Sequence, residues 1–563
     1  MNIILIQESH LKKGLEDLGH RVVVWDECHQ NDTSVHIKAV LDELAEIRPD
    51  VILQIESLRN RLILEGIEEV NVLTAFYALD IHLNYYWHKE YAKLFDVVLV
   101  SQKDYIPRLK KEGIQNAYWF PWAIDPDVLK DHQLARDLDI SFVGMVDDHH
   151  RKKRAQIIKE ISGRFHLHLF GTSMGNRIPQ SEMARVFSRS KIILNESIAG
   201  ELNFRVFEAL ACGGMLLTER VKNGIQDLFQ DGIHLITYGP ENLPEKIEYY
   251  LHHEEERRRI AQQGKEQVYK YHTIKSRAEE LTGILKKNLE NKPAKKFRSP
   301  AIYGKTFFYL AQRKLLASCG QGLTKAIVYF QRAIEKEGSD SEGSIFLAII
   351  YLGLKEYRKA SIILQEIRAK EPAHFQANII LGHLLWEMDH REEAKRIFQL
   401  LFQIHGKQNE TMGKGWNGSP EDPRFHLILG DIYRIKGRDY DPGFIQMNGN
   451  FLPFSAMGYY VKGIAQHPHF LEYLQRVGEI YFKWKMYDLA ARYFQYCVRL
   501  DPSRPGNWKY LGLSSLKCYD RETGIQALRQ SYLLEPSNFL LPIIAREKLR
   551  DHQKKSYENT EGK

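Results

Sequence analysis

A chain of 563 residues is too long for one hydrophobic core, and it predicts about three or four domain-sized units. Hydrophobic residues make up 44% and charged residues 27% of the sequence, which excludes a chain that is disordered throughout. The formal net charge of +7 is small for this length and the basic clusters are short, so we expect no nucleic-acid partner.

The sequence carries no sign of secretion or of membrane insertion. Its five cysteines lie far apart and include no CxxC pair, which is typical of reduced thiols in a cytoplasm. The first residues lack a basic leader, and their apolar run, Ile3–Ile6, is much shorter than that of a signal peptide. No apolar run approaches the ~18 residues that a membrane-spanning helix needs. We therefore expect a cytoplasmic protein with no membrane span.

Short apolar strands alternate with amphipathic helices through the first half of the chain. The first series of strands is Ile3–Ile6, Arg21–Trp25, Val51–Ile55, Val70–Phe76, Asp96–Ser101 and Ala117–Pro121. The second series is Asp139–Gly144, His166–Gly171, Lys191–Asn195, Met215–Glu219 and His234–Tyr238. Apolar strands separated by helices indicate parallel sheets that are covered on both faces. The sequence thus predicts two doubly wound, Rossmann-like lobes, residues 1–124 and 125–290, with the ligand in the cleft between them.

Two common nucleotide-binding motifs are missing. No GxGxxG follows the first strand, and GxxxxGK[ST] occurs nowhere in the chain. A dinucleotide oxidoreductase and a P-loop ATPase therefore lose their main support. A helix N-terminus with basic side chains remains able to hold a phosphate.

The most informative segment begins at Asn203 and reads N-F-R-V-F-E-A-L-A-C-G-G up to Gly214. It resembles the C-terminal lobe of GT-B glycosyltransferases, in particular the bacterial CgeB-like (spore maturation protein-like) group, where N-x-R-x-F-E-A-x-A-C-G-G recurs. This resemblance implies a GT-B fold and a nucleoside-diphosphate sugar as donor, bound mainly by residues 125–290. It also implies that Glu208 accepts hydrogen bonds from the ribose hydroxyls. A carboxylate suits that role because its two oxygens can accept from both vicinal hydroxyls.

The same resemblance places Asn203 and Arg205 in the donor site, with Arg205 one helical turn from Glu208 and near the diphosphate. In the alternative, Glu208 is a solvated helix residue and Arg205 is merely its partner. Many GT-B enzymes carry a second glutamate at a fixed spacing before this one. Here Gly200 stands at that position, and Glu201 follows one residue late.

A second candidate segment opens the second lobe, where a strand ends at Gly144 and a loop leads to the cations Arg151–Arg154. A departing nucleoside diphosphate gains negative charge, which cationic side chains and a helix N-terminus can neutralise. We expect Gly144, Arg151, Lys152 and Arg154 to contact the diphosphate, with Arg151 and Arg154 favoured. The alternative is a solvated first helical turn.

In the first lobe, Asp80 and His82 follow the strand Val70–Phe76, and CgeB-like proteins have a similar D-x-H. An acid and an imidazole at a strand end can activate an acceptor hydroxyl, so both are candidate catalytic residues. The alternative is a capping pair at the strand end.

Two patterns that imitate metal sites are better explained otherwise. The D-x-D string Asp125–Asp127 lies between the predicted lobes and favours a turn. Asp147 and Asp148 precede His149 and His150, and adjacent ligands of this kind rarely reach one ion. We expect a metal-independent enzyme that needs no cofactor besides its donor substrate.

The second half of the chain repeats with a period of 34 residues. Ala326, Ala360 and Ala394 are 34 residues apart, and so are Gly478 and Gly512. A large apolar residue follows each alanine by four positions. These are marks of tetratricopeptide repeats, in which small residues let paired helices approach closely.

About six repeats fit residues 303–540, beginning near Phe307, Ser341, Phe375, Pro423, Leu471 and Pro505. The predicted linker is 291–302, an insertion lies near 439–452, and 541–563 is expected to be a capping helix and a charged tail. The concave face of such an array binds extended peptides or a protein surface.

The leading hypothesis is a glycosyltransferase that moves a sugar from a nucleoside-diphosphate donor to a protein hydroxyl recruited by the repeats. One alternative is a transferase that builds cell-surface polysaccharide and uses the repeats to assemble with partner enzymes. Another is a non-catalytic scaffold with an inert transferase domain. The presence of Asn203, Arg205 and Glu208 counts against the scaffold.

Overall fold

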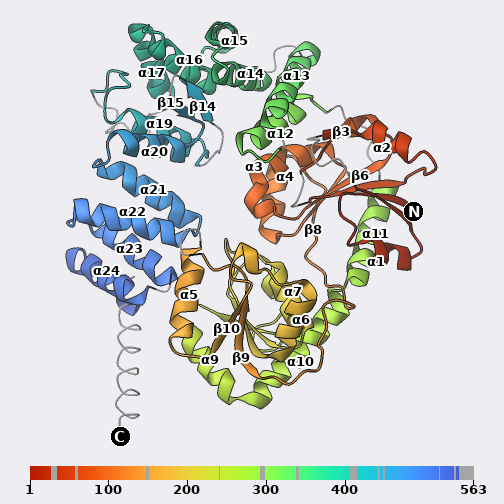
Figure 1. Ribbon diagram of the computed structural model, residues 1–563. Coiled ribbons are helices and arrows are strands. Elements are labelled where there is room, and N and C mark those ends of the chain that lie inside the picture. The colour runs from red at the N-terminus through yellow and green to blue at the C-terminus, as the bar shows by residue number, and fades with distance from the viewer. Residues whose placement is uncertain are drawn as a thin grey trace.

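The computed structural model describes residues 1–26, 34–57, 61–147, 151–239, 241–291, 298–316, 318–337, 341–405, 415–439, 444–447, 450–518, 520–537 and 540–543. These residues form two α/β lobes of the GT-B type followed by an array of helix pairs, as the sequence predicts (Figure 1). Of the helices described, none is long and apolar enough to cross a lipid bilayer.

The first lobe is built on a six-stranded parallel sheet with the order β2-β1-β4-β6-β7-β8. Its strands are β1 (Asn2–Ile6), β2 (Arg21–Trp25), β4 (Val51–Ile55), β6 (Leu73–Ala78), β7 (Val97–Val100) and β8 (Ala117–Trp119). Its helices are α1 (Lys12–Asp17), α2 (Ile37–Glu43), α3 (Ile81–Tyr91) and α4 (Ile106–Lys111), and a small parallel pair joins β3 (Ser34–His36) to β5 (Ile63–Glu65). All residues of β4, β6 and β7 are buried, which explains their continuous apolar sequence.

The second lobe has a five-stranded parallel sheet with the order β10-β9-β11-β12-β13. Its strands are β9 (Leu138–Val143), β10 (Leu167–Phe170), β11 (Ser190–Asn195), β12 (Met215–Glu219) and β13 (Ile236–Tyr238). Its helices are α5 (Lys152–Ser162), α6 (Gln180–Arg189), α7 (Phe204–Ala211), α8 (Ile225–Leu228), α9 (Leu243–His252) and α10 (Glu254–Tyr271). Ligands of such sheets bind beyond the carboxyl ends of the strands.

The last helix before the repeats returns to the first lobe. Helix α11 (Ile274–Glu290) packs against α1, and its apolar face belongs to the core of the first lobe. Gly14 makes this approach possible, because a Cβ atom there would lie 2.9 Å from the side chain of Ile274. The predicted boundaries placed all of residues 125–290 in the second lobe, and α11 corrects them. Local hydrophobic period alone does not reveal which lobe a helix covers.

Six helix pairs follow in the described part of the chain. They are α12 (Ala301–Gln312) with α13 (Cys319–Glu337), α14 (Ser341–Gly353) with α15 (Tyr357–Lys370), α16 (Phe375–Glu387) with α17 (Arg391–His405), α19 (Phe425–Ile435) with α20 (Ala456–Gln466), α21 (Leu471–Lys483) with α22 (Tyr487–Leu500), and α23 (Pro505–Lys517) with α24 (Arg521–Leu534). We call these pairs repeats 1 to 6.

The small and large residues of the 34-residue period meet inside single repeats. A Cβ atom on Gly382 would lie 2.8 Å from the ring of Phe398, and one on Gly478 would lie 2.9 Å from the ring of Phe494. The glycine therefore lets the two helices of a repeat approach until the aromatic ring covers the glycine backbone. This contact is the physical reason for the period.

The insertion in repeat 4 contains a β-hairpin. Strands β14 (Phe444–Met447) and β15 (Asn450–Pro453) pair in antiparallel fashion, and β14 packs against α14 of repeat 2. Most of the predicted capping helix and tail, from residue 544 onward, lies outside the described residues.

Repeat 1 is packed onto the first lobe. Helix α12 lies against α3, and one apolar core runs from the first lobe into the repeats. The hydroxyl of Tyr303 donates to Glu68 at 2.8 Å, and Lys325 and Tyr329 both contact the carboxylate of Glu65. Residues 298–302 of the predicted linker belong to this packed region, where Arg298 donates to the carbonyl of Phe95 at 3.4 Å. The sequence missed this because aromatic helix faces look the same whether they pack on a repeat or on a neighbouring lobe.

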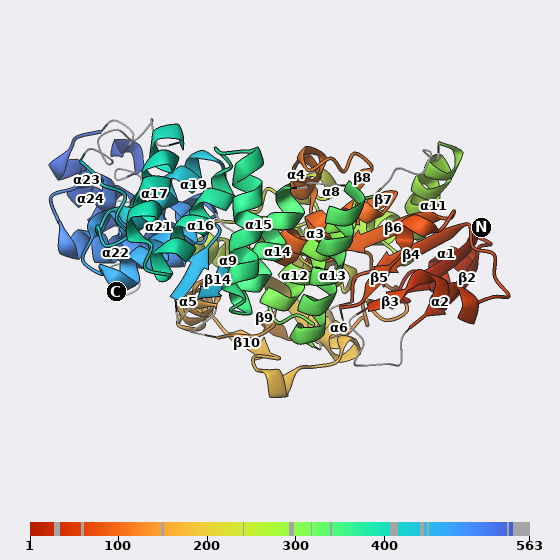
Figure 2. The ribbon, with the colours of Figure 1, turned by 90° about the horizontal axis from the view of Figure 1, so that it is seen from above.

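The array curves from the first lobe toward the second. Figure 2 shows α12 and α13 beside α3, with α23 and α24 at the far end of the array. In Figure 1 the repeats follow an arc whose last members lie next to α5 of the second lobe. The two ends of the array thus meet different lobes.

Candidate active site

The carboxyl edges of the two sheets face each other, and Gln102 joins them. This buried residue follows β7, and its side chain exchanges two hydrogen bonds with the backbone of Leu202, at 3.0 and 3.2 Å. Asn223, which follows β12, donates to the same side chain at 2.6 Å and accepts from the backbone of Asp104 at 2.9 Å. The loops that follow the strands therefore meet at the lobe interface, where the sequence places the ligand.

Glu208 lies on α7 in a buried position and forms an ion pair with Arg205. Nη1 of Arg205 lies 3.1 Å from Oε2 of Glu208, and Gln180 at the start of α6 donates to the other carboxylate oxygen at 3.2 Å. The Glu208 side chain is 9% exposed, which contradicts the alternative of a solvated helix residue. The ion pair with Arg205, which the same alternative predicted, is present.

Burial of this pair disfavours the charged forms of both Glu208 and Arg205. Burial raises the pKa of Glu208, and Arg205 and the amide of Gln180 only partly offset that rise. Burial likewise lowers the pKa of Arg205, whose guanidinium lies 5.4 Å from the ring of Phe187 and contacts Met183. A buried ion pair gains from additional hydrogen bonds, which the hydroxyls of a ribose can donate.

Asn203 stands at the start of α7 and holds the preceding loop. Its amide donates to the side chain of Asn195 at 3.3 Å and to the carbonyl of Glu196 at 3.3 Å. Asn195 in turn donates to Thr218 at 3.0 Å, so the ends of β11 and β12 are tied together. Asn203 therefore shapes the loop between β11 and α7 in this structure.

The cations at the start of α5 separate into different roles. Lys153 lies between two carboxylates, 2.7 Å from the buried Glu196 and 2.8 Å from the partly buried Glu219. Arg154 is also buried and pairs with Glu196 at 2.8 Å through Nε. Burial opposes the charge of Lys153, but Glu219 and Glu196 outweigh it and hold the pKa of the amine well above its usual value. These ion pairs fix the first turn of α5 to the ends of β11 and β12.

Arg151, Gly144 and Lys152 occupy three different positions. Arg151 is the N-cap residue of α5, and burial together with nearby Arg154 lowers its pKa, while Glu196, Asp147 and Glu201 oppose this shift. Gly144 has a φ of +151°, and a Cβ atom there would lie 3.7 Å from Nη1 of Arg154. Lys152 is exposed and lines a cavity on the side of α5 that faces the repeats. The structure therefore brings Arg154 and Gly144 together and leaves Lys152 outside this group.

Glu201 forms hydrogen bonds within the loop between β11 and α7. Its carboxylate accepts hydrogen bonds from the hydroxyl of Ser197 at 2.8 Å and from the backbone of Ile198 and Ala199 at 3.1 and 2.7 Å. These three bonds use the acceptor oxygens that a donor sugar would need. In this structure Glu201 orders the loop between β11 and α7.

Asp80 and His82 follow β6 and lie beside a buried contact between a glutamate and a histidine that the sequence did not predict. Glu56 follows β4 and lies 3.1 Å from Nε2 of His88, and it accepts from the backbone of Asp80 at 3.0 Å. Burial raises the pKa of Asp80, while the charge of His82 opposes this rise. Nδ1 of His82 is buried and has no hydrogen-bond partner among the residues described. An acid with a raised pKa beside an imidazole is suited to accept a proton near neutral pH.

The D-x-D segment is a turn, as predicted. The carboxylate of Asp125 accepts from the backbone of Asp127 at 3.0 Å, and Asp127 pairs with Lys13 at 2.5 Å. The prediction for His149 and His150 falls outside the described residues. Within the described ranges no group of three or more potential ligands is arranged to hold a metal ion.

Four residues of the site are not among those predicted from the sequence, although their positions at strand ends mark them. Glu56, Gln102, Glu196 and Glu219 each lie at the carboxyl end of a buried parallel strand or directly after one. Polar residues at that edge of an α/β sheet are the first candidates for ligand binding. Motif matching alone passes over them because their partners are distant in sequence.

Comparisons with known proteins bear on each half of the chain. Residues 151–283, which include α5, α7 and most of the site, match the family model described as "Glycosyl transferase-like". The second lobe thus belongs to a glycosyltransferase-like domain. Residues 471–504, which cover α21 and α22, match the family model of the tetratricopeptide repeat. No curated protein matches the chain.

Solved structures resemble the glycosyltransferase-like half at low sequence identity. A glycosyltransferase from Rickettsia africae has 12% identity and a TM-score of 0.37, with 52% of this chain and 99% of that chain covered. Sucrose-phosphate synthase from Thermosynechococcus elongatus has 12% identity and a TM-score of 0.39, with coverages of 52% and 100%. An Anabaena protein in complex with UDP-glucose has 11% identity and a TM-score of 0.35, with coverages of 51% and 100%.

Proposed function

We propose that this protein transfers a sugar from a nucleoside-diphosphate donor to a protein hydroxyl that its repeats recruit. The observation that carries the proposal is the buried pair of Glu208 and Arg205 inside a glycosyltransferase-like domain, at the edge where the lobes meet. The sequence resemblance around this pair supports placing the enzyme in the CgeB-like group. The chain acts in the cytoplasm, where nucleotide sugars are available.

The donor binds mainly to the second lobe in this proposal. The Glu208 carboxylate, buried and held by Arg205 and Gln180, accepts hydrogen bonds from the two ribose hydroxyls. Arg151 and the N-terminus of α5 face the diphosphate and neutralise the charge that develops as it leaves. Arg154 acts indirectly, because its pairing with Glu196 holds this first turn in place. Cations take the place of a divalent metal, so no metal is needed.

The acceptor is activated from the first lobe. Asp80 takes the proton of the acceptor hydroxyl as the oxygen attacks the anomeric carbon of the donor sugar. The raised pKa of Asp80 suits this role, and His82 and the Glu56–His88 pair set its charge environment. Gln102 keeps the two lobes at the separation that this attack requires.

A panel of nucleotide sugars tests the donor half of the proposal. Thermal unfolding of the wild-type chain in EDTA is measured with each donor, and the stabilising donor is then followed for release of its nucleoside diphosphate. We expect one class of donor to raise the melting temperature and to be hydrolysed slowly. Glu208→Ala should abolish the thermal shift while the protein stays folded. If no nucleotide sugar stabilises the wild-type protein, the proposed function is wrong.

A further inference from the structure

Along the residues that the structure describes, the repeats do not form one continuous open groove. The first helices of repeats 2, 3 and 4 are buried on every side along their central residues, 343–350, 377–385 and 425–433. The hairpin of repeat 4 adds to this by packing against α14. Packing within the superhelix has therefore filled the space that a long peptide would occupy there.

Repeats 5 and 6 differ from the repeats before them. Buried residues of α21 and α23 alternate with partly exposed ones, including Trp508, Lys509 and Tyr510 in the first turns of α23. Their first helices are thus covered on one face only, as expected for helices that border a binding surface. The accessible part of the array is its far end, which lies next to the second lobe.

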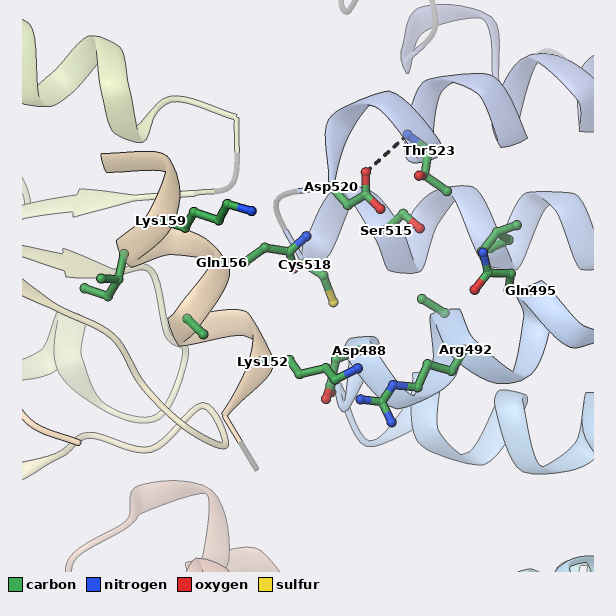
Figure 3. Close-up of a pocket in the computed structure, with 14 residues that line it drawn as sticks. Lys152, Gln156, Lys159, Asp488, Arg492, Gln495, Ser515, Cys518, Asp520 and Thr523 are labelled. Atoms are coloured by element: carbon green, nitrogen blue, oxygen red, sulfur yellow. Dashed lines mark hydrogen bonds between the residues drawn. The ribbon is translucent and has the colours of Figure 1, made fainter. Parts of the chain in front are cut away.

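A cavity of about 790 Å³ separates this end from α5. Figure 3 shows its two walls, with α5 on one side and α22, α23 and the start of α24 on the other. From α5 come Lys152, Gln156 and Lys159, and from α22 come Arg492 and Gln495. Volumes of this size are typical of ligand sites in proteins.

Polar and apolar residues both line the cavity, and its charged residues are of both signs. Gln156 and Gln495 can each donate to and accept from a peptide group, and the hydroxyl groups of Ser515 and Thr523 add further partners. Asp488 and Asp520 partly offset the charge of the three basic residues Lys152, Lys159 and Arg492. Amide and hydroxyl groups on two facing walls suit a ligand that has hydrogen-bond donors and acceptors along its whole length. An extended polypeptide backbone is such a ligand.

The cavity adjoins the candidate active site. Cys518 lines this cavity together with Lys152, and the next residue of α5, Lys153, pairs with Glu219 at the end of β12 at 2.8 Å. Lys153 belongs to the same turn of α5 as Lys152, which lines the cavity. A chain that leaves the cavity along α5 therefore reaches the N-terminus of that helix, where the donor diphosphate is placed.

We infer that this cavity seats an extended segment of the acceptor polypeptide, held between α5 of the transferase and repeats 5 and 6. The inference rests on the proposed function and names the place where its acceptor binds. Because the first helices of repeats 2 to 4 are buried, these repeats bind no peptide and act as a spacer between the first lobe and the cavity. The acceptor touches both halves of the protein at once, so its binding also orders the array against the second lobe.

The test uses the full-length chain, a pool of short synthetic peptides that each contain one serine or threonine, and the donor found with the thermal-shift panel. One variant, Arg492→Ala with Gln495→Ala, alters the wall formed by the repeats. A second, Gln156→Ala with Lys159→Ala, alters the wall formed by α5. The control, Tyr496→Ala with Arg499→Ala, has the same spacing on α22 but does not line the cavity. All these positions are exposed, so the fold should survive.

Both wall variants should raise the KM for peptide transfer by about tenfold, since each removes two hydrogen-bonding side chains. Donor hydrolysis without peptide should stay at the wild-type rate, and the control should match wild type in both assays. Wall variants that modify peptides as well as wild type overturn the inference and leave the proposed function intact. If the wild-type enzyme hydrolyses the donor but modifies no peptide, the cavity does not bind an acceptor polypeptide. If it neither binds nor hydrolyses any donor, the proposed function is wrong as well.

Discussion

The side chain of Gln102 in the first lobe and the backbone of Leu202 in the second form a reciprocal pair of hydrogen bonds, at 3.2 and 3.0 Å. Leu202 lies next to Asn203, the residue that begins α7. One buried amide therefore connects the first lobe to the helix that carries Glu208. The lobe interface and the candidate donor site are parts of one hydrogen-bonded unit.

Gln102→Ala should loosen this unit. The backbone groups of Leu202 and the amide of Asn223 would lose their partner in a buried place, which costs about 1–3 kcal/mol for each group that water does not reach. We expect a lower free energy of unfolding in urea together with a loss of turnover. Gln115→Ala is the control, because Gln115 makes an exposed hydrogen bond to the carbonyl of Lys110. Equal stability of both variants would show that Gln102 does not hold the lobes together.

Glu208→Ala should weaken donor binding at least about tenfold, because a charge-assisted hydrogen bond contributes roughly 1.5–3 kcal/mol. Calorimetric titration with the stabilising donor measures this. Glu182→Gln on the neighbouring α6 is the control, since Glu182 is exposed. Donor affinity that is unchanged in Glu208→Ala would remove Glu208 from the site.

The raised pKa of Glu208 also predicts a pH dependence. The ionised carboxylate is the form that accepts from ribose, and burial raises its pKa above the usual value for glutamate. As the pH falls, the protonated form accumulates and donor affinity is lost, at a higher pH than for an exposed glutamate. Glu208→Gln should bind weakly at every pH and lose this dependence. A wild-type affinity that does not change from neutral pH down to the onset of acid unfolding would contradict the assignment.

Lys153 and Lys152 are adjacent, yet their replacement should have opposite outcomes. Lys153→Ala leaves Glu219 without its amine partner and Glu196 with Arg154 alone, and the loss of these partly buried contacts costs about 1–3 kcal/mol. Lys152→Ala removes an exposed charge and should change the free energy of unfolding by less than about 0.5 kcal/mol. Chemical denaturation of the two variants side by side checks this. Comparable losses in both would show that the buried cluster contributes little to stability.

Gly478→Ala should destabilise repeat 5, because the added Cβ would lie 2.9 Å from the ring of Phe494. Forcing these helices apart costs about 1–3 kcal/mol. Gly506→Ala in α23 is the matched control, since a Cβ atom there meets nothing within 4 Å. Thermal melting should separate the two variants. A Gly478→Ala protein as stable as the control would mean that the helices of repeat 5 can separate without loss.

A chain truncated after Glu290 should fold poorly. The sequence suggests a clean boundary near the predicted linker, but α12 covers α3 and the two share one apolar core. Removing the repeats exposes that face of the first lobe, and we expect aggregation or a lower melting temperature than for the full-length chain. Size-exclusion chromatography and thermal melting measure both. A monomeric truncated protein with the melting temperature of the full-length chain would show that the repeats are an independent domain.

Features that depend on local pattern are the ones that the sequence determines by itself. Apolar strands alternating with helices require parallel sheets, and a small residue every 34 positions requires paired helices, because each pattern reflects the geometry of consecutive residues. The string from Asn203 to Gly214 likewise marks one helix and the double glycine that leads to the next strand, which is why the sequence alone proposes Glu208 and Arg205 as site residues.

The tertiary structure decides which charges meet and which surfaces remain open. Four consecutive cations look alike in sequence, but folding pairs Lys153 and Arg154 with Glu196 and leaves Lys152 facing the repeats. The tertiary structure also decides that Gln102 contacts Leu202, 100 residues away in the sequence. It decides as well that the first helices of repeats 2 to 4 are buried on every side along their central residues. Such contacts depend on how distant elements pack, and helical or strand periodicity carries no information about that packing.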